Sequence, residues 1–361
     1  MKKCAREWLC ALLALVLVLG LTGCGGSGSS DIKVNVEVPE EYKEFVTPYN
    51  VNVVEKAKSD GKMHYYFMAS EGYVANAGDH NAIKWGDSCL IVYPDGTTML
   101  IDAGVEGYGP ILVLNLKLMG IEKLDYFVLT HPHDDHGYGA VRPGGLLENI
   151  EVGHVYYSGV LNAGWSNPTI LPDLCKEKGI PCDIIKEGDK LTIGGVEIQV
   201  LNPTGEVAGT TIAGSDETGS ITKTNNASLV MRFDFEEHSA LFTGDIYRAA
   251  ESELVKKYKE SGLLDVDFLK LPHHGGDTSN SITLVKAVTP VLGVATGNDP
   301  VDIMVYGNYK KNTTVLMDSE DGYIHVTADK DGVMTYETSR ARSEKSAYGQ
   351  LPEAKERKLT A

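Results

Sequence analysis

The sequence predicts an α/β protein in which two α/β halves pack sheet to sheet and carry a site where strands end. Two observations support this prediction. Apolar stretches of strand length alternate along the chain with stretches of helical spacing. Clusters of His and Asp directly follow several of the predicted strands. Because ligands of open α/β sheets bind beyond the carboxyl ends of strands, these clusters indicate one shared site.

The first half begins with strands and continues as strands alternating with helices. A hairpin is expected where strands at 88–93 and 97–101 flank the turn Pro94-Asp95-Gly96. Helical spacing over 111–119 ends at Gly120, a typical C-cap residue. The other expected elements are strands at 64–68, 124–130, 154–157, 183–185, 190–193 and 196–201, and helices at 146–150 and 171–178.

The second half repeats this alternation after a polar stretch at 204–223, which predicts a surface loop. Strands at 228–235 and 239–242 form a second hairpin. Further elements are helices at 248–258 and 281–287 and strands at 266–271, 291–295, 314–317, 323–327 and 333–337. The charged tail at 340–361 is expected to be disordered.

The amino-terminal residues have the pattern of a bacterial export signal. Lys2, Lys3 and Arg6 precede an apolar stretch at 8–21, shorter than the ~20 residues that span a bilayer. The sequence LTGC at 21–24 resembles the lipobox of bacterial lipoproteins, and a flexible Gly/Ser sequence follows it. We therefore expect a signal peptide at 1–23 and a lipid on Cys24 that anchors the protein at the extracytoplasmic face of the membrane. An ordinary signal peptide with a chance cysteine is the alternative.

Residues 24–62 are expected to form a flexible tether and stalk, with one short helix at 41–45. The chain has 361 residues and a formal net charge of −17. Residues 1–23 contain three basic residues and one acidic residue, so their removal changes this charge to −19. A strongly acidic protein repels polyanions at long range, and this disfavours nucleic acid as the partner.

Three of the six cysteines lie within the predicted folded domain. Cys89 falls in an apolar strand pattern and is expected to be a buried small hydrophobic residue. Cys175 and Cys182 could pair in an oxidising compartment, or they could remain free thiols at a helix end and a strand start. The sequence does not decide between the two.

The densest polar cluster is THPHDDHG at 130–137, directly after the predicted strand at 124–130. His131 and His133 are two residues apart in a short loop and can reach one ion, while Asp135 and His136 can serve a second ion. Gly137 would allow a tight turn into a helix. Imidazole and carboxylate are good ligands for Zn²⁺, Mn²⁺ or Fe. The cluster therefore predicts a metal site rather than a solvated polar loop.

Three further strand ends carry matching groups, and together the four motifs resemble the metallo-β-lactamase superfamily. They are LIDAG with Asp102, LFTGD with Asp245, and LKLPHHGG with His273 and His274. The resemblance covers about residues 63–337 and implies a four-layer αββα sandwich, so we expect a hydrolase domain at 63–339. The stretches GDSCLIVYPDGTTMLIDAG and NNASLVMRF resemble the branch with the soluble domain of ComEC-type DNA-uptake channels and secreted phosphorylcholine esterases.

The resemblance implies a role for each motif. Asp245 would bridge two Zn²⁺ ions, with Mn²⁺ or Fe as alternatives, and Asp102 would orient ligands or the bound water. The other implied ligands are His131 and His133 for metal one, and Asp135, His136 and one of His273 and His274 for metal two, with His274 favoured. Many family members have a further histidine where this chain has Asn225 and Asn226. Metal one then has three protein ligands or is weakly occupied, so one ion and two ions both stay open.

This site predicts a metal-dependent phosphoesterase or phosphodiesterase that uses hydroxide held between the ions. The expected substrate is a small-molecule or surface-polymer phosphoester. Besides Asp135, the candidate catalytic residues are Asn226, Lys270 and His273, as contacts for phosphate or the leaving group; Lys270 could equally be a solvated lysine. His80, in a long loop at 68–85, is expected to face solvent. The alternatives are a nuclease, a β-lactam hydrolase, which the motifs disfavour, and a non-catalytic binding lipoprotein, which the complete ligand set disfavours.

Overall fold

The computed structural model describes residues 36–49, 52–68, 86–165, 167–212, 219–297 and 300–352. All of them belong to one compact unit. The predictions for the export signal, for Cys24 and for His80 lie outside the described residues. Within those residues, no helix has the length and apolar character needed to cross a membrane.

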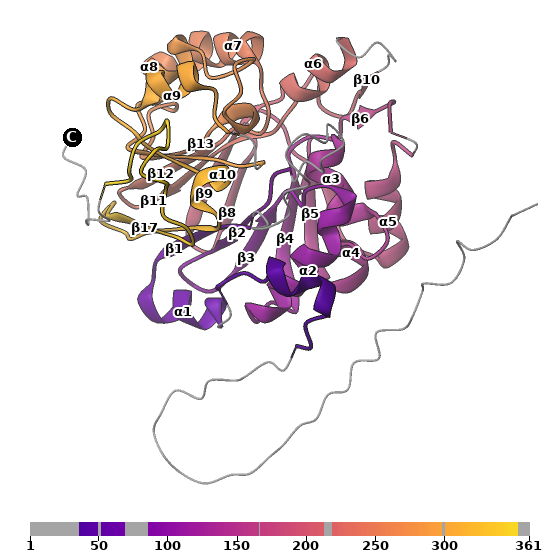
Figure 1. Cartoon of the computed structure of the whole chain (residues 1–361). Coiled ribbons are helices and arrows are strands. Elements are labelled where there is room, and N and C mark those ends of the chain that lie inside the picture. The colour runs from indigo at the N-terminus through magenta and orange to yellow at the C-terminus, as the bar shows by residue number, and fades with distance from the viewer. Residues whose placement is uncertain are drawn as a thin grey trace, which may run out of the picture. The chain divides into compact units, whose positions relative to one another are not determined.

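Two mixed sheets form the centre of the unit (Figure 1). In spatial order, the first contains β17 (Met334–Thr338), β16 (Ile324–Ala328), β1 (Met63–Phe67), β2 (Cys89–Val92), β3 (Thr98–Ile101), β4 (Lys123–Leu129), β5 (Glu151–Tyr157) and β7 (Cys182–Ile184). The second contains β15 (Thr314–Met317), β14 (Leu292–Ala295), β13 (Phe268–Lys270), β12 (His238–Phe242), β11 (Val230–Phe235), β9 (Val196–Asn202) and β8 (Lys190–Ile193).

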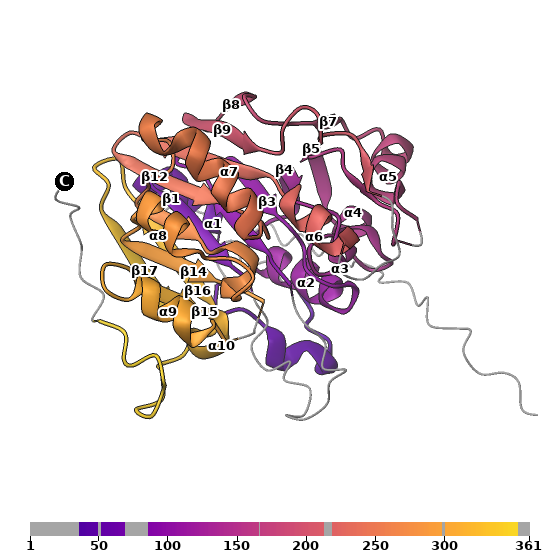
Figure 2. The same ribbon diagram turned by 90° about the horizontal axis from the view of Figure 1, so that it is seen from above.

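Helices cover the outer face of each sheet, as two views at right angles show (Figures 1 and 2). The helices packed on the first sheet are α1 (Val53–Asp60), α2 (Gly109–Leu118), α3 (Asp134–Val141), α4 (Leu146–Asn149) and α5 (Ile170–Lys178). Those packed on the second sheet are α7 (Arg248–Tyr258), α8 (Ile282–Val288) and α9 (Ile303–Tyr309).

Strand side chains alternate between the inner and outer cores. In β1, Tyr65 and Phe67 point into the core between the two sheets, while Tyr66 joins the core under the helices. In β13, Phe268 faces the inner core and Leu269 the outer one. This period of two is the geometry of a strand that is buried on both faces. The predicted four-layer αββα sandwich is confirmed.

The polar stretch at 204–223 differs from its prediction as a surface loop. It contains β10 (Thr211–Ile212), which pairs with β6 (Leu161–Asn162), and the start of α6 (Gly219–Asn226). Sequence periodicity also did not indicate α9 or α10 (Asp318–Asp321). These helices are four to eight residues long, too short to show a clear apolar repeat.

Both ends of the described region pack on the domain, in contrast to the expected stalk and disordered tail. A short helix, η1 (Glu40–Phe45), falls where one was expected, and Phe45 and α1 contribute to the core under the helices. At the other end, Arg342 is buried and pairs with Asp321 at 2.7 Å between Nη2 and Oδ2. The expected stalk is partly folded because apolar side chains before residue 62 pack on the core. The start of the expected disordered tail is ordered because Arg342 binds a buried carboxylate.

The cysteines of the domain are free thiols in the structure. Cys89 is buried in the inner core, as predicted. Cys175 in α5 is buried, Cys182 in β7 is half-buried, and their side chains hydrogen-bond each other.

Candidate metal centre

The THPHDDHG segment joins the end of β4 to the start of α3, at one edge of the first sheet. His131 and His133 face each other, with 3.0 Å between Nε2 of the first and Nδ1 of the second. The helix begins at Asp134, three residues earlier than a turn at Gly137 would place it. Gly137 instead permits close packing, because a Cβ there would lie 2.7 Å from a ring carbon of Trp165.

Asp245 follows β12 of the second sheet and meets the histidines of the first. Its Oδ2 lies 3.1 Å from Nε2 of His136 and 4.0 Å from Nε2 of His131. The same oxygen lies 3.2 Å from Nε2 of His274. One carboxylate oxygen thus lies between ring nitrogens that come from both sheets, as a bridging ligand would.

The two adjacent histidines after β13 take different positions. His274 points into the cluster, with Nε2 also 3.4 Å from Oδ2 of Asp135. His273 turns aside: its Nδ1 lies 2.6 Å from Oγ1 of Thr278, and its ring centroid lies 4.8 Å from that of Tyr247. Both histidines have a positive φ, 47° and 56°, a conformation that costs free energy in residues other than glycine. This left-handed backbone is what sends the two rings in different directions.

The side chains that meet here have the composition and geometry of a cation site. Ligand atoms of Asp135, His136, Asp245 and His274 all lie within 4.8 Å of one another. Oδ1 of Asp245 and Nε2 of His133 are among the buried polar atoms of the described residues that have no hydrogen-bond partner. Both lie at the cluster, and such atoms fit a site that binds a cation. Converging imidazole nitrogens and carboxylate oxygens fit a divalent transition metal.

Asp102, which directly follows β3, contacts His136 on the side away from the cluster. Its Oδ2 lies 2.7 Å from Nδ1 of His136 and accepts the hydroxyl hydrogen of Thr130 at 2.7 Å, while Oδ1 accepts the Thr130 backbone N–H at 2.8 Å. Nδ1 of His136 is thereby engaged, and Nε2 is directed at the cluster. Carboxylate partners of this kind fix the tautomer and orientation of metal-binding histidines.

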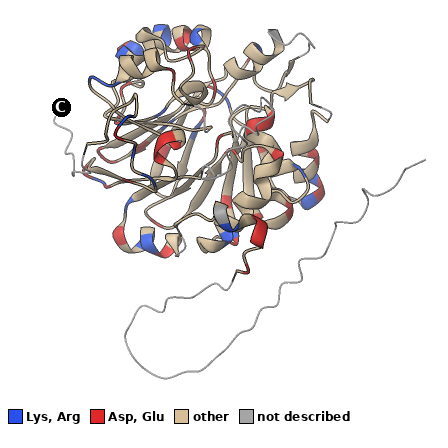
Figure 3. Cartoon of the chain, in the orientation of Figure 1, with Lys and Arg blue, Asp and Glu red and all other residues tan. Residues whose placement is uncertain are grey.

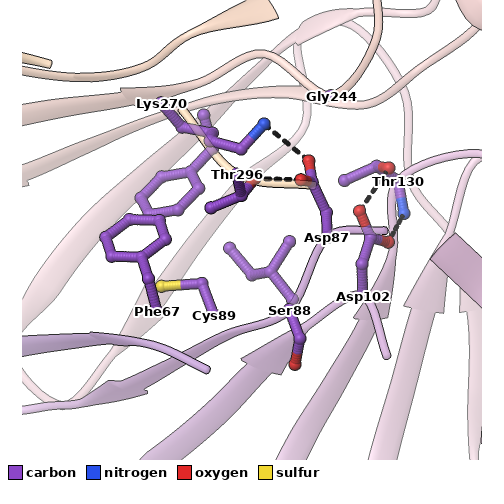
Figure 4. Close-up of a pocket in the computed structure, with 11 residues that line it drawn as sticks. Phe67, Asp87, Ser88, Cys89, Asp102, Thr130, Gly244, Lys270 and Thr296 are labelled. Carbon is purple, nitrogen blue, oxygen red and sulfur yellow. Dashed lines mark hydrogen bonds and ion pairs between the residues drawn. The ribbon is translucent and has the colours of Figure 1, made fainter. Parts of the chain in front are cut away.

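Asp87 makes the corresponding contact to His274 and is a site residue that the sequence analysis did not single out. Its Oδ1 lies 3.1 Å from Nδ1 of His274. Asp87 and Asp102 line the same pocket between the two sheets (Figure 4). The signal in the sequence is Gly86-Asp87-Ser88 directly before a buried strand, within a stretch that resembles a family motif.

The electrostatics of the cluster favour bound cations. Burial lowers the pKa of His131 and His133, so both rings are neutral ligands. Burial also opposes charge on His136 and His274, but Asp245 and the neighbouring carboxylates prevail and raise their pKa well above the ordinary value. The carboxylates therefore draw positive charge to these ring nitrogens, which a divalent cation supplies when it displaces their protons.

Two of the predicted catalytic residues lie in unexpected surroundings. Lys270 is buried rather than solvated, and its Nζ lies 2.5 Å from Oδ2 of Asp87. The Asn226 side chain accepts the backbone N–H of Tyr247 at 2.9 Å, so its oxygen is engaged. Its neighbour Asn225 is the buried one: its Oδ1 has no partner among the described residues, and its side chain hydrogen-bonds the Tyr247 phenol.

Fold and site together define a metal-dependent hydrolase of αββα type with a His/Asp metal site. Residues 85–294 match the metallo-β-lactamase superfamily, and the chain belongs to this superfamily. The chain is also related to competence proteins. It is 25% identical to ComE operon protein 3 of Bacillus subtilis over 248 residues, which cover 64% of this chain and 29% of that protein.

Two further similarities complete the comparison. Competence protein ComA of Neisseria gonorrhoeae is 28% identical over 229 residues, covering 62% of this chain and 25% of that protein. The chain thus spans less than a third of the length of these relatives. The crystal structure of the metallo-β-lactamase fold protein YhfI from Bacillus subtilis aligns with a TM-score of 0.45 and 14% identity, covering 76% of this chain and all of that one.

Proposed function

We propose that the protein is a two-metal phosphoesterase that acts on phosphodiesters or phosphomonoesters. The observation that carries this proposal is the position of Asp245, whose Oδ2 lies within 4.0 Å of Nε2 of His131, His136 and His274. A shared carboxylate oxygen of this kind suits two ions that lie ~3.5–4 Å apart.

The residues fall into two ligand groups on either side of Asp245. His131 and His133 would hold one ion, and Asp135, His136 and His274 would hold the other. Zn²⁺ suits this mixture of imidazole and carboxylate, with Mn²⁺ and Fe as alternatives. When bound, such ions supply an acidified water as nucleophile and neutralise charge on a phosphoester.

Two neutral hydrogen-bonding side chains, His273 and Tyr247, lie beside the cluster and would face a substrate. Nδ1 of His273 is engaged by Thr278, so Nε2 is the ring nitrogen that can reach a substrate oxygen. Burial lowers the pKa of His273, against the opposing effect of Asp245, and keeps the ring neutral. Burial raises the pKa of Tyr247, so its phenol keeps its proton. These two side chains would donate hydrogen bonds to phosphoryl or leaving-group oxygens.

The charge distribution favours a small or surface-attached phosphoester over a long nucleic acid. Lys270 is engaged by Asp87, so the metal ions would neutralise the phosphate. The chain carries a net charge of −17, and on the described helices Lys and Arg are interspersed with Asp and Glu (Figure 3). A protein that binds DNA along its length usually presents a basic face.

We further infer that the enzyme works outside the cytoplasmic membrane, anchored through Cys24. The lipobox-like LTGC at 21–24 and the Gly/Ser sequence after it support this inference. Labelling of cells with a fatty-acid analogue is expected to mark the wild-type protein and not Cys24→Ser. Equal labelling of both would overturn the inference.

The test of the function uses the full chain, loaded separately with Zn²⁺, Mn²⁺ or Fe²⁺. Four substrates distinguish the candidate reactions: bis-p-nitrophenyl phosphate, a phosphorylcholine ester, single-stranded DNA and nitrocefin. We expect turnover of the first two and loss of that turnover in Asp245→Asn. No phosphoester turnover with any ion would overturn the proposal.

Other outcomes would identify a different function. Cleavage of DNA with little turnover of the small esters would favour a nuclease, in keeping with the competence proteins to which the chain is related. Turnover of nitrocefin alone would indicate a β-lactam hydrolase. A protein that takes up no stoichiometric metal would be a binding module that keeps the fold.

A further inference from the structure

A buried ion pair lies beneath the metal centre and connects the two sheets (Figure 4). Lys270 comes from β13 of the second sheet, and Asp87 precedes β2 of the first. Only 4% and 5% of these residues is exposed, and their charged atoms lie 2.5 Å apart. Nζ of Lys270 also donates to the carbonyl of Leu271 at 3.1 Å.

Each oxygen of Asp87 has its own partners. Oδ2 receives Lys270, while Oδ1 accepts the hydroxyl of Thr296 and lies 3.1 Å from Nδ1 of His274. The opposite nitrogen of the same imidazole, Nε2, faces the carboxylates of the metal centre. Asp87 therefore contacts the ring on the side away from the ion, where a partner can set both its tautomer and its direction.

The backbone of Asp87 is fixed to the metal-binding loop as well. Its N–H donates to the carbonyl of Asp135 at 3.0 Å, and its carbonyl accepts from Gly104 at 2.9 Å. Gly86, with φ +76°, makes this approach possible, because a Cβ there would lie 1.5 Å from the Asp135 carbonyl oxygen. Asp87 is thus tied by its backbone to one proposed ligand, Asp135, and by its side chain to another, His274.

The stability of the fold alone does not explain why two charged side chains, Asp87 and Lys270, are buried at this position. Lys270 shares the inner face of β13 with Phe268, where an apolar side chain would fit the core. Two charges removed from water cost several kcal/mol each, and apolar replacements of such pairs are often neutral or stabilising. The contact to His274 supplies a reason, because that ring sits on a left-handed backbone outside any regular strand or α-helix.

We propose that Asp87 is a positioning residue that orients His274 toward the metal ions, and that Lys270 and Thr296 hold Asp87 in place for this task. The inference rests on the proposed function, because it requires that His274 binds an ion. In this proposal Asp87 orients His274 as Asp102 orients His136. The difference is that Asp87 also pairs with a cation from the opposite sheet, Lys270.

The test separates the hydrogen bond from the charge. Three variants of the full chain are needed: Asp87→Ala, the double variant Asp87→Ala with Lys270→Met, and the double variant Asp87→Asn with Lys270→Met. Zn²⁺ affinity is measured by competition with a chromophoric chelator, alongside thermal unfolding of the metal-free protein and kcat and KM on the diester. Loss of an outer partner weakens metal binding by roughly 10- to 100-fold, and we expect that loss in Asp87→Ala.

The two double variants give the decisive comparison. Both remove the buried charges together, so both are expected to unfold at a higher temperature than Asp87→Ala, which leaves Lys270 unpaired. Only the asparagine double variant keeps an oxygen for Nδ1 of His274, and it should recover most of the Zn²⁺ affinity. Equal affinity in the two double variants would overturn the inference, because the Thr296 carbonyl, 3.1 Å from the same nitrogen, would then suffice.

A matched control comes from a second buried carboxylate–cation pair, Asp321 and Arg342, which makes no contact with the cluster ligands among the interactions described. Asp321→Ala with Arg342→Met should change stability and leave Zn²⁺ affinity unchanged. An equal loss of affinity in this control would assign the effect to the fold and overturn the inference. If the wild-type protein itself bound no ion, the proposed function would fail first, and the two failures are thereby distinguished.

Discussion

The described residues include two clusters of buried histidines, which differ in what their ring nitrogens face. The second cluster lies around His64 in β1 and His325 in β16. Nδ1 of His64 lies 3.0 Å from Nε2 of His325, and the two outer nitrogens face Asp60 at 3.1 Å and Glu337 at 3.6 Å. The His325 ring stacks on Tyr66 with 4.1 Å between centroids. Each ring nitrogen of this pair therefore has a protein partner.

The metal centre has the opposite arrangement. Its imidazole nitrogens converge on shared carboxylate oxygens, and Nε2 of His133 and Oδ1 of Asp245 have no partner within the described residues. Burial is thus common to both clusters and identifies neither. Converging lone pairs together with several carboxylates are what distinguish a cation site from a pair of core histidines.

The largest effect expected from this difference is the loss of metal after removal of one carboxylate charge. Asp245→Asn removes the oxygen charge shared by His136 and His274, so metal content should fall and activity should drop by more than ~100-fold, the upper range for mere outer partners. Elemental analysis and the diester assay measure the two effects.

Asp60→Asn is the matched control, because it neutralises a carboxylate that contacts a buried histidine in the second cluster. It should keep full metal content and activity. Equal metal loss in both variants, or in neither, would contradict the distinction between the clusters.

The same difference explains how much the sequence could predict. His131, His133, Asp135 and His136 are close in sequence, so their spacing alone indicated a metal site. His64 and His325 are 261 residues apart and meet only through the pairing of β1 with β16. No local pattern marks such a pair.

Tertiary contacts add surroundings for Asn226 and Lys270 that the sequence does not contain. Asn226 accepts a backbone N–H, the buried Oδ1 of Asn225 has no partner among the described residues, and Lys270 pairs with Asp87 across the two sheets. Side chains on neighbouring positions of a strand or turn point in different directions, and the sequence does not contain those directions. The fold class and the strand ends were predictable because they depend on repeated patterns rather than on one contact.

The second cluster should instead make the stability of the folded protein sensitive to acid. Burial, with a smaller effect of His64, lowers the pKa of His325 to about 2. The unfolded chain, with a histidine pKa of about 6.5, then binds the extra proton, so stability falls as pH drops below about 6.5. Between pH 7 and 5 this residue should cost about 2 kcal/mol of unfolding free energy. Urea unfolding of wild type and His325→Gln at both pH values measures the difference.

In His325→Gln the pH-dependent loss should be smaller by that amount. An unchanged slope in His325→Gln would show that this cluster does not resist protonation as its burial requires.

The smallest effect is expected when the neutralised carboxylate contacts a histidine that binds no ion. The side chain of Asp60 is 30% exposed and faces Nε2 of His64. Burial already lowers the pKa of His64 and Asp60 opposes it, so the ring is neutral at pH 7 with or without that charge. Asp60→Asn should therefore change the unfolding free energy by less than about 1 kcal/mol in urea at pH 7. A larger loss would mean that His64 carries a proton in the folded protein, and the two clusters would then share the electrostatic character that their geometry separates.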